Sequence, residues 1–201
     1  MNLKETASQT AGPFVHIGLA PEAAGIPTGR NARENLMAQP GCQGERIRIE
    51  GVVTDGEGNA VKDALIEVWQ ADAEGCFHHR DSPGRADPKV SNWGRCAASF
   101  EDGTWSFTTV KPGPTPAADG RLQAPHVDLL IHARGINFHL MTRVYFADEA
   151  VANAEDPLLQ LIDDEDRRAT LIAGRSNRAG QTVYRFDIRL QGEGETVFLD
   201  F

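Results

Sequence analysis

Long hydrophobic runs and paired cysteines are both missing from this chain of 201 residues. No apolar run approaches the roughly 18 residues that a membrane-spanning helix requires, and the polar start MNLKETASQTAGP lacks the apolar segment of a signal peptide. Cys42, Cys76 and Cys96 are scattered and form no C-x-x-C pair, a pattern typical of reduced thiols. We therefore expect a cytoplasmic protein.

Positive charge is also scarce, because 20 Lys and Arg stand against 29 Asp and Glu, for a formal net charge of −9. This balance argues against nucleic acid or an anionic membrane as the partner, although it leaves room for a local basic pocket that binds a small anion. The length fits one domain with appendages.

Patterns of β-strands begin near Glu45 and continue to the C-terminus. Turns such as Asp102-Gly103 between apolar runs are strong cues for hairpins. Four strand pairs are predicted: 46–55 with 64–72, 96–100 with 104–110, 125–133 with 136–147 (turned at Gly135), and 181–191 with 195–201. About eight strands at this spacing predict a mainly β fold, a β-sandwich or barrel.

Two other segments depart from the strand pattern. Residues 148–174 read as a short helical insert, with Pro157 near a helix start and Gly174 near a stop. Residues 1–44 have no sustained period, yet GPFVHIGLA at 12–20 is too apolar for a free tail. We therefore expect an N-terminal arm that lies either over its own domain or across a partner.

Two connections, 73–95 and 111–123, are much longer than the ~4–6 residues usual in compact domains. Long loops are disproportionately functional or interfacial. Both precede strands, so we expect them to gather at one end of the fold.

A histidine and a carboxylate, His126 and Asp128, stand at the entry of the strand 125–133 and share one face of it. With His139 on the next strand they would match the two-His-one-carboxylate triad of non-heme Fe(II) oxygenases, one hypothesis for function. His132 lies roughly 20 Å along the strand and cannot complete such a triad. The alternative is a buried His126 that is hydrogen-bonded within the fold.

Arg134 occupies the tight turn between two strongly apolar strands. An arginine held there could present its planar fork to a carboxylate. The alternative is an ordinary turn arginine in solvent.

Several segments together resemble the intradiol ring-cleavage dioxygenases: SQTAGPFVHIGLA, VWQADAEGCF, WSFTTVKPGP, APHVDLLIHARGINFHLMTRVYF and YRFDIRLQGEGETVFLDF. The match is to the alpha chains of the family's two-chain enzymes. It implies a β-sandwich core at 45–201, an interfacial arm at 1–44, and a hetero-oligomer with a beta chain. It also implies that the beta chain holds Fe(III) through two Tyr and two His, while this chain holds no metal.

The family's iron-binding pattern is eroded here. Iron-bearing chains have Pro-Gly-Pro-Tyr-Pro followed by Arg-Pro-x-His-x-His. The Tyr position holds Thr115, the Arg position holds Gln123, and the second His has become Asp128, so that His126 alone survives. The 73–95 loop has no Tyr, and the chain's two tyrosines, Tyr145 and Tyr184, stand in strand patterns as structural residues. We interpret His126 and Asp128 as the remnant of a metal site.

The resemblance assigns this chain a supporting role. It implies that Arg134, Thr10, Gly12 and Pro13 line the pocket around the partner's iron. Phe14 is a departure at an aromatic position where we expect Tyr in some relatives. The implied reaction is cleavage of 3,4-dihydroxybenzoate by O₂ to 3-carboxy-cis,cis-muconate, with no catalytic residue in this chain. A non-catalytic binding or interaction module on a sandwich scaffold is the alternative from another class.

Overall fold

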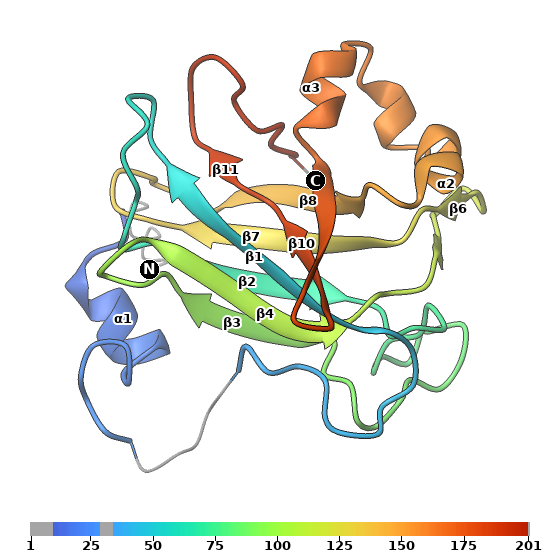
Figure 1. The fold of residues 1–201 in the computed structure, drawn as a ribbon, viewed down its shortest axis with the longest axis horizontal. Coiled ribbons are helices and arrows are strands. Elements are labelled where there is room, and N and C mark those ends of the chain that lie inside the picture. The colour runs from blue at the N-terminus through green and yellow to red at the C-terminus, as the bar shows by residue number, and fades with distance from the viewer. Residues whose placement is uncertain (1–9, 29–33, 201) are drawn as a thin grey trace, which may run out of the picture.

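A computed structural model describes residues 10–28 and 34–200, so the predictions that fall on 1–9, 29–33 and Phe201 lie outside the described residues. Two layers of strands face each other, with β1, β4 and β10 in front of β2, β3 and β7 (Figure 1). The mainly β prediction is confirmed. The strands are β1 (Arg46–Thr54), β2 (Leu65–Gln70), β3 (Trp93–Ala97), β4 (Thr104–Val110), β5 (Thr115–Pro116), β6 (Leu122–Gln123), β7 (His126–His132), β8 (Leu140–Phe146), β9 (Ile172–Arg178), β10 (Gln181–Arg185) and β11 (Ile188–Arg189).

The hydrophobic core fills the space between the layers. Ile47 and Ile49 of β1 pack with Trp105 of β4 from one side, and Leu129 and Ile131 of β7 come from the other. All five are at most 1% exposed. Strand β9 joins the layers at one edge, since it pairs with β10 in antiparallel and with β8 in parallel orientation.

The first predicted hairpin is wrong. The turn after β1 closes only a local bridge, Thr54 to Ala60, and the chain then crosses to the other layer. Strand β2 pairs with β3 and β7, while β1 pairs with β4, β10 and β11. The apolar faces of β1 and β2 therefore meet across the core, and both are buried without sharing an edge.

The Asp102-Gly103 turn forms, but it too connects layers instead of a hairpin. Gly103 has the positive φ of 77° that favours glycine. The N–H of Ser99 donates to the carbonyl of Thr104, yet β3 continues in one layer and β4 in the other. The pair 125–133 with 136–147 is confirmed as β7 and β8, turned at Gly135 with φ of 91°, although β8 begins only at Leu140.

The C-terminal prediction is partly wrong. Residues 181–191 divide into β10 and β11, which both pair with β1, and 195–200 contribute only an isolated bridge, Leu199 to Met141. Strand β9 was not predicted, because it is mostly exposed and polar. Gly174 lies within β9, so it does not stop a helix.

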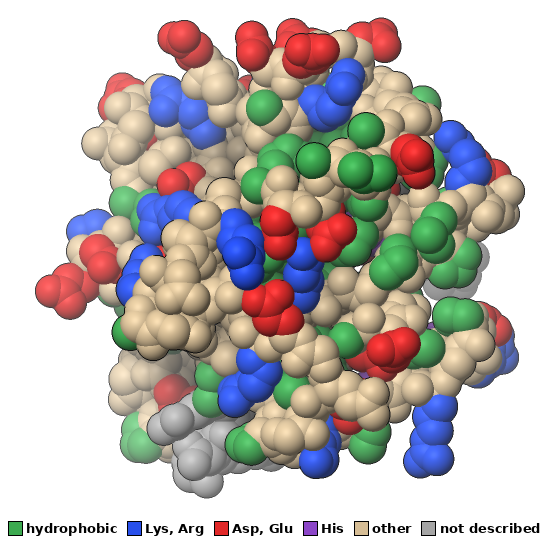
Figure 2. Space-filling model, turned by 45° about the vertical axis from the view of Figure 1, so that its right-hand side comes forward, with side chains coloured by type: hydrophobic (Ala, Val, Ile, Leu, Met, Phe, Trp, Pro, Cys, Tyr) green, Lys and Arg blue, Asp and Glu red, His purple; other side chains and the backbone are tan. Residues whose placement is uncertain are grey.

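Short helices occupy the predicted insert: α2 (Ala150–Glu155), the 3-10 helix η1 (Leu159–Leu161) and α3 (Glu165–Ala169). Asp164 caps α3, because its side chain accepts hydrogen bonds from the N–H groups of Asp166 and Arg167. None of the helices in the described residues is long and apolar enough to cross a membrane. On the face drawn in Figure 2, acidic side chains gather along the upper edge, and acidic and basic ones lie next to each other near the centre.

The arm contains a helix that its sequence did not reveal, α1 (Pro13–Leu19), at the end of the sandwich opposite to α2 and β6 (Figure 1). Proline at the first helical position suits a helix start. Further along the arm, Met37 is 1% exposed and joins the core, and Leu36 and Ala38 bridge to the domain. This later part of the arm therefore packs on its own domain.

Candidate functional site

A cavity of about 600 Å³ lies between the arm and the β7–β8 turn. Two residues that the sequence singled out, Gly12 and Arg134, line it together, although 121 positions separate them. Thr10 fixes this arrangement, because its hydroxyl accepts a 2.7 Å hydrogen bond from the N–H of Gly135. Pro13 begins α1 directly after Gly12. The structure thus brings the four predicted residues to one end of the sandwich.

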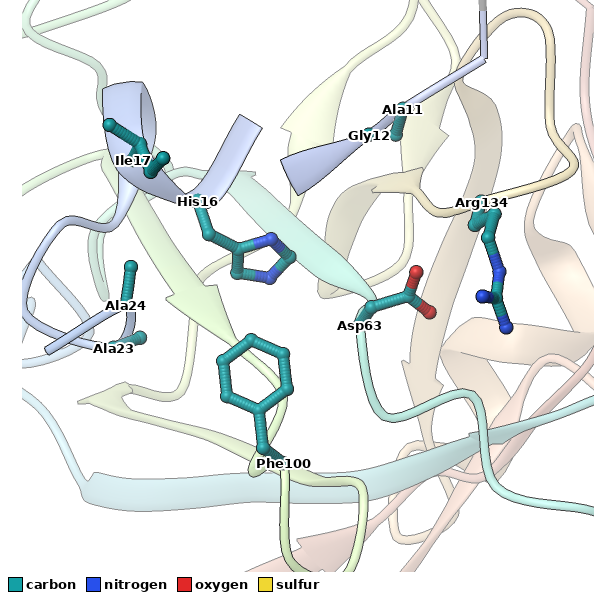
Figure 3. Close-up of a pocket in the computed structure, with 9 residues that line it drawn as sticks. All are labelled: Ala11, Gly12, His16, Ile17, Ala23, Ala24, Asp63, Phe100 and Arg134. Atoms are coloured by element: carbon teal, nitrogen blue, oxygen red, sulfur yellow. The ribbon is translucent and has the colours of Figure 1, made fainter. Parts of the chain in front are cut away.

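The guanidinium of Arg134 is the cationic wall of this cavity. Arg134 is exposed, and it makes no ion pair or hydrogen bond within residues 10–28 and 34–200. Figure 3 places its side chain across from His16, with Asp63 between them in the view and Phe100 below His16. A guanidinium without a carboxylate partner is suited to receive an anionic ligand.

His16 is a cavity residue that sequence reasoning missed. It is 6% exposed and packs on Phe100 with 5.1 Å between ring centroids, while its Nε2 has no hydrogen-bond partner in the described part of the chain. Burial lowers the pKa of the imidazole, and the charge of Asp63 opposes that shift only in part. His16 is therefore largely neutral near pH 7, which leaves Arg134 as the cation. A helix of seven residues gives too short a period for the sequence to indicate its buried face.

The remnant lies at the opposite end of β7, about 20 Å from the turn over the strand's seven residues. His126 is 7% exposed, and its Nδ1 lies 2.7 Å from the carbonyl oxygen of Ala124. Burial lowers the pKa of His126, and the neighbouring Arg143 lowers it further. The two long loops meet at this end as predicted, because Ala73 and Glu74 of the first line one pocket with Gly113 and Pro114 of the second.

Arg143 of β8 dominates the remnant end. It stands directly opposite Asp128 in the register, and its Nε donates to Asp128 Oδ1 at 2.7 Å. Its Nη1 donates to Gln123 Oε1 at 2.7 Å. The side chains of Arg143 and Asp128 are 9% and 15% exposed, so their ion pair is mostly buried. Sequence reasoning missed Arg143, since its importance depends on the cross-strand register.

The residues at this end do not fit an iron ion. Thr115 is buried and offers a neutral hydroxyl where Fe(III) favours anionic oxygen. His139 lies 5.9 Å from His132 between ring centroids, at the other end of β7, so the Fe(II) triad hypothesis with His126 and Asp128 is wrong. Among the described residues no group of three His, Cys, Asp or Glu could hold a metal.

Both tyrosines are structural, as the sequence indicated. Tyr145 and Tyr184 are fully buried, and their hydroxyls donate to carboxylates of Asp156 and Asp148, each at 2.9 Å. Burial raises the pKa of both phenols. Neither is available as a phenolate ligand.

Comparison with known proteins gives a consistent result. Residues 24–192 match a family model described as "Dioxygenase". The chain is 53% identical to the protocatechuate 3,4-dioxygenase alpha chain of Pseudomonas putida, covering 99% of this chain and 98% of that one. It is 30% identical to the protocatechuate 3,4-dioxygenase beta chain of Burkholderia cepacia, covering 85% of this chain and 74% of the other.

Solved structures share the fold. The dioxygenase domain of a dioxygenase carbohydrate-binding protein fusion from Streptomyces sp. SirexAA-E superposes with a TM-score of 0.55. The identity is 20%, and the match covers 80% of this chain and 86% of that one. The 3-chlorocatechol 1,2-dioxygenase of Rhodococcus opacus superposes with a TM-score of 0.57 at 20% identity, and the match covers 77% of this chain and 63% of that one.

Proposed function

Because the chain belongs to the intradiol ring-cleavage dioxygenases, we propose that it is the alpha subunit of a two-chain enzyme acting on 3,4-dihydroxybenzoate (protocatechuate). In this proposal the subunit has no catalytic residue of its own. The beta chain holds Fe(III), which supplies the activation of the ring toward O₂. The alpha chain shapes the substrate pocket and completes the assembly in the cytoplasm.

Arg134 carries the main role in this proposal. Its guanidinium binds the carboxylate of the substrate, which leaves both ring hydroxyls free to face the partner's iron. Gly12 lines the same cavity, the Thr10 hydroxyl holds the β7–β8 turn through Gly135, and Pro13 follows at the start of α1, so we assign all three to the substrate pocket. The observation that carries the proposal is the contrast between the two ends of β7. At one end the Arg134 guanidinium stands beside a cavity and has no partner among the described residues, and at the other end Arg143 is paired with Asp128 of the remnant.

Oxygen uptake with 3,4-dihydroxybenzoate tests this function. We expect no oxygen uptake from this chain alone, and a lower rate from the beta chain alone than from the pair. When both chains are expressed together, we expect full uptake with 3-carboxy-cis,cis-muconate as the product. Uptake by this chain alone would refute the assignment. A beta chain that is fully active by itself would refute the supporting role.

The domain proposal assigns residues 1–44 to an interfacial arm and 45–201 to the sandwich. Exposed apolar side chains support an interface at the arm's end of the molecule. Phe14 is 82% exposed, and Phe138, beside the β7–β8 turn, is 69% exposed. Ile17 and Leu19 are 44% and 42% exposed. Contact with the beta chain would remove this surface from water, with a total buried area above ~2,000 Å² as in obligate complexes.

Deleting residues 1–20 is expected to weaken the complex and its activity together. The deletion removes Phe14, Ile17 and Leu19 from the interface and the Thr10 hydroxyl from the turn. Gel filtration of the co-expressed chains measures assembly, and oxygen uptake measures activity. A truncated chain that still forms a fully active complex would contradict the interfacial role.

A further inference from the structure

Arg143 offers a second reason for the absence of a metal site, besides the lost ligands. We propose that its guanidinium provides the positive charge at the remnant end and by itself excludes a metal cation from His126 and Asp128. This inference concerns the opposite end of β7 from the substrate pocket, so it does not depend on the proposed function.

The Arg143 guanidinium contacts three side chains at the remnant. Nε donates to Asp128 at 2.7 Å and Nη1 donates to Gln123 at 2.7 Å, with the Tyr145 hydroxyl 3.5 Å from the same nitrogen. Arg143 is 7% exposed, so these contacts are largely shielded from water. The Asp128 carboxylate, which could otherwise bind a metal, is already paired with a cation.

The surviving histidine is still prepared as a ligand. Its Nδ1 faces the Ala124 carbonyl at 2.7 Å, so in the neutral ring Nδ1 carries the proton and Nε2 keeps its lone pair. This is the tautomer that metal-bound histidines adopt, with a backbone carbonyl orienting the ring. The remnant thus keeps one usable ligand, and ligand loss alone is an incomplete explanation.

The positive charge of the guanidinium also repels a metal cation from the site. An arginine cannot lose its proton in a protein, so it remains positive beside any incoming cation. Burial disfavours the charged form, but the charge of Asp128 and the hydrogen bonds to Asp128 and Tyr145 more than offset this and raise the pKa of Arg143. A metal ion at Asp128 would therefore compete with a fixed cation in a shielded environment, where repulsion is stronger than in water.

The neighbouring carboxylate, Asp156, has hydrogen-bond donors of its own. Asp156 is fully buried, and it accepts hydrogen bonds from the Tyr145 hydroxyl and from the N–H groups of Ala124, Leu158 and Leu159. These four donors satisfy the carboxylate oxygens of Asp156. Asp128 is the carboxylate that accepts the 2.7 Å hydrogen bond from Arg143 Nε, and replacing both members of that pair removes none of these four donors.

Two variants of the full chain separate the guanidinium from the ligands. Asp128→His places a second histidine beside His126 and keeps Arg143. Asp128→His with Arg143→Gln in addition replaces the guanidinium by a shorter, neutral amide. Both variants are titrated with Co²⁺, whose visible absorption reports histidine ligation. Circular dichroism checks that each is folded before metal is added.

We expect the double variant to bind Co²⁺ at least tenfold more tightly than Asp128→His alone, with the added binding lost on His126→Ala. Equal affinities in the two variants, or no binding by either, would overturn the proposal, because ligand loss would then explain the absence of metal by itself. An affinity gain that survives His126→Ala would also overturn it, since the ion would be bound elsewhere.

Discussion

Replacing Arg143 by methionine is expected to lower the free energy of unfolding by about 3–5 kcal/mol. Methionine is long and flexible enough to fill much of the same space. The loss arises because Asp128, whose side chain is 15% exposed, remains as a mostly buried carboxylate without a countercharge. Gln123 loses the donor to its side-chain oxygen at the same time.

Chemical denaturation of the full chain measures this loss, and two controls identify its cause. Arg143→Met combined with Asp128→Leu should recover most of the stability, because an apolar pair can replace a buried salt bridge at little cost. Arg121→Met breaks another 2.7 Å ion pair, with Asp119, but both side chains are more than half exposed. It should cost no more than about 1 kcal/mol. A similar, small loss for Arg143→Met would contradict a stabilising role for the buried pair.

Replacing Arg134 by alanine is expected to lower kcat/KM for protocatechuate roughly 10- to 100-fold in the alpha–beta complex. A guanidinium–carboxylate contact shielded from water contributes on the order of 1.5–3 kcal/mol, and each ~1.4 kcal/mol is a factor of ten. Catechol has no carboxylate, so its already poor turnover should change little. The iron spectrum should be unchanged, because Arg134 touches no ligand in this proposal.

The ratio of kcat/KM for the two substrates, in the original protein and in the variant, discriminates the possible roles of Arg134. Arg134→Lys is the matched control, since it keeps the charge and loses the planar fork, and it should fall between the other two. An equal loss on both substrates would mean that Arg134 supports the fold or the subunit contact and does not bind the carboxylate.

The sequence predicted local structure better than it predicted which layer each strand joins. Asp102-Gly103 correctly indicated a turn, but a turn does not say whether the next strand pairs with its neighbour or crosses the core. Strand β9 was missed because pairing with β8 and β10 holds it despite its polar residues. These outcomes depend on contacts between distant segments, which no local pattern contains.

The site divides in the same way. The resemblance identified the family and the remnant positions, and the structure brought Gly12 and Arg134 to one cavity. Whether Arg134 binds the substrate stays a prediction. Arg143 and His16 were missed. The role of Arg143 depends on its place opposite Asp128 on the neighbouring strand, and the role of His16 depends on the burial of one face of α1. Side chains whose roles come from the register or from docking of the arm require the folded structure.

Iron analysis of the purified chain, alone and in complex with the beta chain, tests the central claim most directly. The account predicts a colourless chain with no stoichiometric iron when isolated, and a complex with about one iron for each beta chain, whose phenolate ligands give colour. Thr115, Asp128 and a 73–95 loop without tyrosine motivate this expectation. About one tightly bound iron in each isolated chain, lost on His126→Ala, would contradict it.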